Sequence, residues 1–249
     1  MTVWLTGCVQ EEFESTPSPA GNGIRFTLTV PDVNLPSVSS RTMTGTGTAK
    51  KEDEIETVDI LVFDMSKTPA VFLEWVSATG VTQDLADNST VSFSAVLSPT
   101  TASTCIVVVA NKELDNIVSG FTKGATTKVE AMEKMLHTQT GKWLADGSTT
   151  GGYTRIPMYG EKVISKITPS MDPITGINMK RMLARIDIRN NSATSNFTVE
   201  EVYLANYNTT GYIAPAWNTN GQVTDPVPDT PVLPAGSGKK TEEDRKSVV

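Results

Sequence analysis

The sequence of 249 residues has few of the side chains on which most catalytic and metal sites depend. It contains one histidine, His137, and two cysteines, Cys8 and Cys105, that lie far apart in the chain. A zinc site, a Ser-His-Asp triad or a Cys-His dyad would therefore have to use His137. Its place near the end of an expected helix favours a structural or surface role. We expect no enzymatic activity, no metal and no cofactor.

Basic residues and long apolar runs are scarce as well. The chain carries 21 Lys plus Arg against 28 Asp plus Glu, which gives a net charge of −7. The basic residues are scattered, whereas a phosphate-binding surface needs a basic patch. Nucleic acid is therefore excluded as the main partner. No apolar run reaches 18 residues, so the sequence predicts no membrane-spanning helix.

What the sequence has in abundance is threonine and serine, and Thr suits half-buried pleated surfaces. The clearest strand pattern is residues 24–30, in which Ile24, Phe26, Leu28 and Val30 alternate with polar residues. This alternation predicts a strand with one buried face.

Further apolar runs recur at intervals, with turn signals between them. These runs are Ile55–Asp64, Val71–Ala78, Val91–Leu97, Cys105–Ala110, Glu161–Ile167 and Asn178–Arg189. Their spacing predicts an all-β sandwich, with Ile55–Phe63 and Ile106–Val109 as central strands. Cys105 is interpreted as a small buried hydrophobic residue of a central strand.

One helix is expected to interrupt the strands. Thr127 and Glu130 match a capping box, and Val129, Met132 and Leu136 follow at helical spacing. The pattern predicts a short helix over residues 128–137.

The N-terminus carries a motif of its own. Leu5-Thr-Gly-Cys8 matches the bacterial lipobox, in which small residues precede a cysteine that is acylated. The polar stretch Val9–Gly23 suits a tether. We expect lipidation at Cys8, against the alternative of a chance match. Only four residues precede Leu5, so we expect the upstream part of a signal peptide to be missing.

The remaining segments set the expected domain organisation. Residues 32–54 are almost free of apolar side chains, which predicts an exposed loop around Arg41. A composition break at 190–195 and a Pro-rich end after Trp217 divide the rest of the chain. We expect a lipobox and tether over 1–21, an N-terminal β-sandwich over 22–190, and an incomplete second β domain with a disordered tail over 191–249.

The order of these motifs resembles that of the Bacteroidales fimbrillins, the FimA and Mfa type subunits of surface fimbriae. The most specific element is the turn Arg155-Ile-Pro-Met-Tyr-Gly160, followed by Met182-Leu-Ala-Arg-Ile-Asp-Ile188. The other matching elements are the lipobox, the first strand, the Arg41–Thr42 loop, Ile55–Asp64, Ile106–Asn111 and Phe197–Asn206. The resemblance covers about residues 1–215.

This resemblance implies a fold and an assembly route. It implies transthyretin-like β-sandwich domains and export as a lipoprotein, held in outer-membrane lipid through Cys8. An Arg-specific protease would cut between Arg41 and Thr42 and release the strand that contains Ile24, Phe26, Leu28 and Val30. A strand from another copy would then fill the opened groove. The product would be a homopolymeric fimbrium at the cell surface that supports adhesion to an unknown ligand.

Two departures and two alternatives stay open. We expect the second domain, whose C-terminal strands are the expected donors, to be mostly missing, and the signal peptide to be cut short. An anchor or tip subunit would share the fold and lipidation but keep its first strand. A glycan-binding surface lipoprotein would instead present exposed aromatic residues in a cleft, drawn from Trp75, Trp143, Tyr153, Tyr159 and Trp217.

Overall fold

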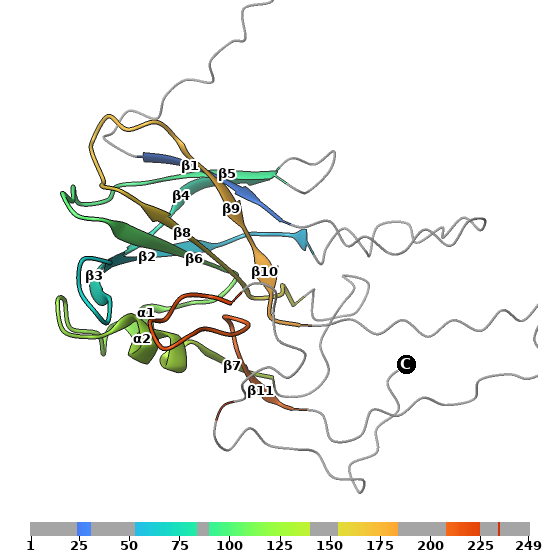
Figure 1. Cartoon of the computed structure of the whole chain (residues 1–249). Coiled ribbons are helices and arrows are strands. Elements are labelled where there is room, and N and C mark those ends of the chain that lie inside the picture. Colours follow the sequence, from blue (N-terminus) through green and yellow to red (C-terminus); the bar gives the residue numbers. More distant parts are fainter. Residues whose placement is uncertain are drawn as a thin grey trace, which may run out of the picture.

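Two β-sheets packed face to face form the centre of the molecule, and a layer of helices and short strands covers one of them (Figure 1). The structure is a computed structural model that describes residues 24–30, 53–83, 90–139, 154–183, 208–224 and 234. The expected all-β sandwich is therefore confirmed.

The first sheet has four strands in the order β4-β5-β1-β9. These strands are β4 (Thr79–Gln83), β5 (Thr90–Ala95), β1 (Ile24–Thr29) and β9 (Ile174–Asn178). β1 runs antiparallel to β5 and parallel to β9, so it lies inside the sheet with a hydrogen-bonded neighbour on each side.

The second sheet has five antiparallel strands in the order β10-β8-β6-β2-β3. These strands are β10 (Lys180–Arg181), β8 (Met158–Ile164), β6 (Thr104–Ala110), β2 (Val58–Asp64) and β3 (Val71–Ser77). Every residue of β6 is buried, as are the first six of β2. This burial on both faces explains the continuous apolar runs Ile60–Phe63 in β2 and Cys105–Ala110 in β6, and it confirms the expected central position of the two strands.

The main core fills the space between the two sheets. From the four-stranded sheet it includes Phe26 and Phe93, and from the five-stranded sheet Ile60, Ile106 and Met158. The inward side chains of both sheets pack against one another here.

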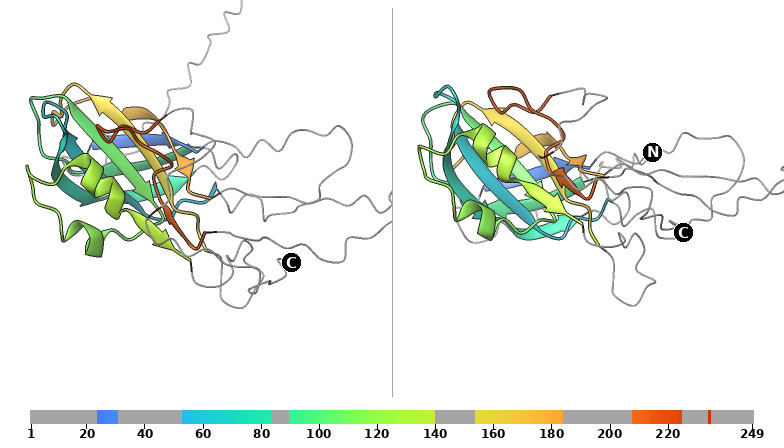
Figure 2. Two further views of the ribbon diagram at one scale, coloured as in Figure 1. Left: turned by 60° about the horizontal axis from the view of Figure 1, so that its bottom comes forward. Right: turned by 90° about the horizontal axis from the view of Figure 1, so that it is seen from below.

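A second core lies on the opposite face of the five-stranded sheet. It is covered by helices α1 (Asp115–Val118) and α2 (Lys128–Lys134) and by the strand pair β7 (Leu136–Thr138) and β11 (Thr210–Tyr212). Figure 2 shows α2 lying across this face. Residues 208–224, the C-terminal strap, complete the layer with buried Ile213 and Ala214.

Several expected boundaries differ from the observed ones. The capping box at Thr127 and Glu130 is confirmed, but the helix ends three residues before His137. Met135 leaves the helical conformation there, with φ −79° and ψ 77°, and the chain then pairs with β11 as β7. The single-turn helix α1 was not predicted, because four residues carry no readable periodicity.

The last two expected strands also shift. The expected strand at 161–167 begins earlier, at Met158, and ends at Ile164. The single strand expected over 178–189 is instead the end of β9 followed by the short β10. Its remainder, residues 184–189, lies outside the described residues.

The expected domain division falls largely outside the described residues. The boundary near residue 190 is not described, and the described part of the following segment is the C-terminal strap with residue 234. The strap packs on the outer face of the N-terminal sandwich, and the division at 190 stays a prediction. In the described ranges, no helix combines the length and the apolar character needed to cross a bilayer.

Candidate functional site

The feature of this fold that bears most directly on function is the position of β1. The chain enters β1 from residues 1–23 and leaves it through residues 31–52, and neither segment is described. β1 pairs with β5 from Ile24↔Ala95 to Thr29↔Thr90 and with β9 from Phe26↔Ile174 to Thr29↔Asn178. We call the space that β1 fills between β5 and β9 the slot. A strand at the N-terminus of a chain thus fills the interior of a sheet.

The apolar face of β1 points into the main core, as its alternation predicted. Ile24, Phe26, Leu28 and Val30 are at most 4% exposed. The ring of Phe26 stacks on that of Phe93 in β5, with centroids 5.0 Å apart and planes 6° from parallel. Burying four such side chains stabilises the folded chain by roughly 1.5–3 kcal/mol each. The slot is therefore lined by a strongly apolar surface on its core side.

The β9 side of the slot has an irregular geometry. The register shifts between Phe26 and Leu28, so Ile174 and Ile177 both face the core although they are three residues apart. Gly176 between them has φ +71°, a conformation that favours glycine. No alternating pattern marks β9, and sequence reasoning missed this wall of the slot.

The chain then crosses directly from one sheet to the other. Met179 connects β9 to β10, and its backbone N–H donates to the carbonyl oxygen of Thr29 at 2.9 Å. The crossing passes so close to Gly160 that a Cβ there would lie 2.7 Å from the Met179 sulfur and 2.8 Å from Ile177. This approach explains why the motif at 155–160 ends in glycine.

The next described segment begins at Asp53, and hydrogen bonds to Asn111 fix the residues that follow it. Asn111, at the end of β6, donates from Nδ2 to the carbonyl oxygens of Glu54 at 2.8 Å and Ile156 at 3.0 Å. Its Oδ1 accepts from the backbone N–H of Glu56 at 2.9 Å. Asn111 holds this position with φ 58°, which Asn tolerates better than most residues.

The other predicted site residues lie outside the described residues. These are Cys8, with the expected lipid, and Arg41 and Thr42, with the expected protease cut. Arg25, the preceding arginine, is half-buried inside β1 and paired with Ser94 of β5. A backbone held in a strand ladder is a poor protease substrate.

Burial shifts the pKa of several described side chains, among them His137, Cys105 and Tyr159. Burial lowers the pKa of His137 and raises that of Cys105 to about 11. Burial also raises the pKa of Tyr159 far above its ordinary value. In the described part of the chain, no group of three His, Cys, Asp or Glu side chains is placed to hold a metal ion.

A buried polar network lies beneath the C-terminal strap, and the sequence analysis did not predict it. Lys128, fully buried, pairs with Glu161 at 2.6 Å, and the hydroxyl of Tyr159 donates to the same carboxylate oxygen at 2.7 Å. The backbone N–H of Val223 donates to the other oxygen at 3.0 Å. No local signal marks a lysine at the first turn of a helix for burial.

The aromatic residues considered for a glycan cleft are mostly packed in the second core. Tyr159 is 1% exposed, and Trp75 is half-buried with its Nε1 donating to Asp59 at 3.0 Å. Trp217 makes an edge-to-face contact with Tyr212 at 4.7 Å. Trp143 and Tyr153 lie outside the described residues.

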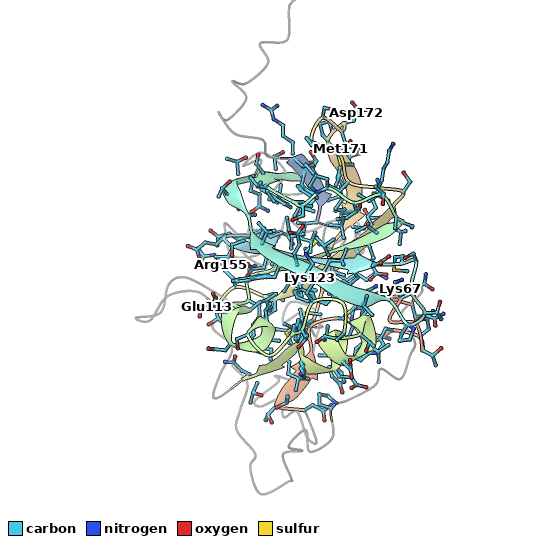
Figure 3. The ribbon with its side chains drawn as sticks, turned by 90° about the vertical axis from the view of Figure 1, so that its left-hand side faces the viewer. Lys67, Glu113, Lys123, Arg155, Met171 and Asp172 are labelled. Atoms are coloured by element: carbon cyan, nitrogen blue, oxygen red, sulfur yellow. The ribbon has the colours of Figure 1, made fainter. Side chains whose placement is uncertain are left out.

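The charged side chains labelled in Figure 3 lie apart from one another. Figure 3 shows Arg155 and Lys67 at opposite flanks, and Met171 with Asp172 at the tip of the β8–β9 loop. Arg155 forms ion pairs with Glu54 at 3.4 Å and Glu56 at 2.9 Å. The slot occupied by β1 remains the candidate site.

Comparison with known proteins gives the family. A fimbrial assembly protein from Parabacteroides distasonis ATCC 8503 is similar in structure, with 11% identity and a TM-score of 0.43 over 90% of this chain and 84% of that one. No curated protein matches the sequence. Residues 24–227 match the family of major fimbrial subunit proteins (FimA). The chain therefore belongs to the FimA major fimbrial subunit family, and it is a structural subunit, not an enzyme.

Proposed function

We propose that this subunit polymerises by exchange of β1 for a strand of another copy, after export as a lipoprotein and cleavage between Arg41 and Thr42. The observation that carries the proposal is the position of β1, an N-terminal strand in the interior of the four-stranded sheet. Its loss would divide the sheet and open the slot.

The open slot has the two properties that a strand-accepting site needs. Its walls, β5 and β9, would each present a row of backbone N–H and C=O groups without partners. Its floor would present the side chains on which Phe26 and Leu28 now pack, among them Phe93 and Ile177. An incoming strand with alternating apolar residues would satisfy both, while an empty slot would be costly in water.

Arg41 is the residue proposed to control this exchange. It is the only arginine between Arg25 and Arg155, and it lies among residues with almost no apolar side chains. A guanidinium is the side chain that an Arg-specific protease recognises through a carboxylate in its pocket. A cut at Arg41 would separate β1, together with the lipid on Cys8, from the rest of the chain.

The test is the Arg41→Ala variant in cells that assemble fimbriae, with Lys50→Ala in the same segment as the matched control. We expect Arg41→Ala to leave uncut, membrane-held monomer, while Lys50→Ala forms polymer like the parent. The readouts are the N-terminal sequence of the mature chain and the ladder of SDS-resistant polymer. Polymer formation by Arg41→Ala would contradict the proposal and would favour the anchor or tip subunit that keeps its first strand.

Lipidation has an independent test. The Cys8→Ala variant should appear in the soluble fraction, whereas the parent, expressed with its complete upstream region, should fractionate with the outer membrane. Equal release of both forms would refute the lipobox interpretation without affecting strand exchange.

A further inference from the structure

Asp53, the first described residue after the loop of the proposed cut, contacts the end of β4 in the four-stranded sheet and β10 in the five-stranded sheet. Its backbone carbonyl oxygen accepts from Gln83 Nε2 at 2.7 Å, and the N–H of Ile55 donates to Gln83 Oε1 at 3.0 Å. Its carboxylate forms an ion pair with the guanidinium of Arg181. The side chains of Asp53 and Arg181 are only 11% and 15% exposed, so solvent screens this pair little.

The two partners of Asp53 stand at the same end of the slot. Gln83 is the last residue of β4 and pairs with Val91, which in turn pairs with Leu28 of β1. Arg181 ends β10, three residues after Asn178, the β9 residue that pairs with Thr29. Asp53 therefore links the β4–β5 side of the slot to the β9–β10 side, at the end where β1 finishes.

This link matters because β1 itself is the connection between those two sides. In the order β4-β5-β1-β9, the strands β5 and β9 have no ladder with each other in the described sheet. They are held apart by two strand spacings, about 9.5 Å, for as long as β1 lies between them. Once β1 leaves, the unpaired backbone edges of β5 and β9 and the apolar floor between them would be exposed to water, and closing the gap would pair the edges and cover the floor.

Resting on the function proposed above, we propose that Asp53, Gln83 and Arg181 form a brace that keeps the slot at one-strand width while β1 is absent. The brace contains no atom of β1, so departure of the strand does not break it. Asp53 also lies 12 residues C-terminal of Arg41, on the part of the chain that the cut retains. The three are positioning residues, and the ligand of the braced slot is a β-strand with alternating apolar side chains.

The brace combines two hydrogen bonds between Gln83 and the backbone with one ion pair between side chains. The carboxamide of Gln83 both donates and accepts, which fixes the backbone of residues 53–55 against the end of β4. The ion pair then ties the same residues to β10, which is continuous with β9 through Met179. Charge-assisted contacts of this sort carry more geometric specificity than an apolar contact of equal area.

The experiment measures slot competence directly in the full chain. A recognition sequence for a site-specific protease is inserted between Arg41 and Thr42, so the test does not depend on Arg41 being the natural cut. After cutting, a fluorescent peptide with the sequence of residues 22–31 is added in excess. Fluorescence polarisation gives its affinity and its rate of exchange with the resident β1.

The brace variants are Asp53→Asn, Gln83→Ala and Arg181→Met. They change three separate segments of the chain, so if one variant fails to fold, the other two still test the proposal. Glu56→Gln is the matched control, because it breaks a 2.9 Å ion pair with Arg155 in the same segment but touches neither wall. We expect the nicked brace variants to bind the peptide at least roughly tenfold more weakly than the nicked parent. The control should bind within about twofold of the parent.

The comparison with uncut chains separates positioning from stability. With β1 covalently in place its two ladders set the width of the slot, so the uncut variants should keep the circular dichroism spectrum of the uncut parent, while the loss of one partner from a mostly buried ion pair lowers their melting temperature. Peptide binding by the nicked variants that equals the parent's would overturn the brace and leave strand exchange standing. If the melting temperature of each variant falls by the same amount, relative to the matching parent, in the uncut and in the nicked form, the brace is also overturned. Failure of the nicked parent to accept any peptide would instead refute strand exchange, and the brace with it.

Discussion

Lys128 offers a sharp test of the energetics of this fold, because its ammonium is completely buried. Within the described part of the chain its ion pair is with Glu161 at 2.6 Å, under a C-terminal strap whose Gly221 approaches the lysine stem. A Cβ on Gly221 would lie 3.0 Å from Lys128 Cγ. The strap is therefore in close contact with the lysine stem.

The two single substitutions should therefore differ in cost. Glu161→Gln leaves a buried ammonium without counter-charge, which destabilises by about 3–5 kcal/mol. Lys128→Met leaves a carboxylate that is 17% exposed and still accepts from the Tyr159 hydroxyl and the Val223 N–H, so about 1–3 kcal/mol is expected. The larger loss is a substantial part of a typical stability of roughly 5–15 kcal/mol.

Urea unfolding followed by circular dichroism measures both free energies, and Glu133→Gln on the exposed face of α2 is the control, expected within about 0.5 kcal/mol of the parent. For a chain of this size, the melting temperature should fall by roughly 6–20 °C in Glu161→Gln. Hydrogen exchange at Val223 should quicken in the same variant. A cost below about 1 kcal/mol for Glu161→Gln, or a larger cost for Lys128→Met, would refute the reasoning.

Three further predictions concern single side chains. Phe26→Ala should lower the free energy of unfolding by about 3–5 kcal/mol in urea titration, and Thr29→Ala on the exposed face of β1 should leave it nearly unchanged. Burial lowers the pKa of His137, so the stability it contributes is present above the unfolded value of about 6.5 and is lost as pH falls through the folded value. His137→Gln should flatten the pH dependence of the melting temperature over this range. In Cys8→Ala, the Cys105 thiol, with its pKa raised to about 11, should react with Ellman's reagent only as the chain unfolds, and fast native reaction would contradict its burial.

The parts of the fold that could be predicted are those in which local pattern and tertiary position agree. Residues 24–30 alternate because β1 has one face in the core and one face outward. The runs in β2 and β6 are continuously apolar because a core lies on each side of their sheet. The capping box at Thr127 satisfies backbone groups within its own turn, so it needs no distant partner.

The parts that could not be predicted depend on distant partners or broken patterns. Leu136 lies at helical spacing after Met132, yet pairing with Tyr212 of β11 makes it part of a strand. β9 lacks an alternating signal because Gly176 takes a left-handed conformation. Of the slot, the sequence therefore predicted only the strand that fills it, β1. The brace at Asp53 joins residues up to 128 positions apart, so no local sequence pattern predicts it.

The five-stranded sheet, with a separate core on each face, has a thermodynamic consequence for assembly. β1 contributes side chains to the core between the sheets and none to the core beneath the helices and the strap. We therefore expect replacement of β1 by another strand to perturb the core between the sheets. The contacts that hold α2 and the strap in place should stay intact. If the proposed strand exchange takes place, we expect the subunit to pass through a strand-free intermediate without unfolding as a whole.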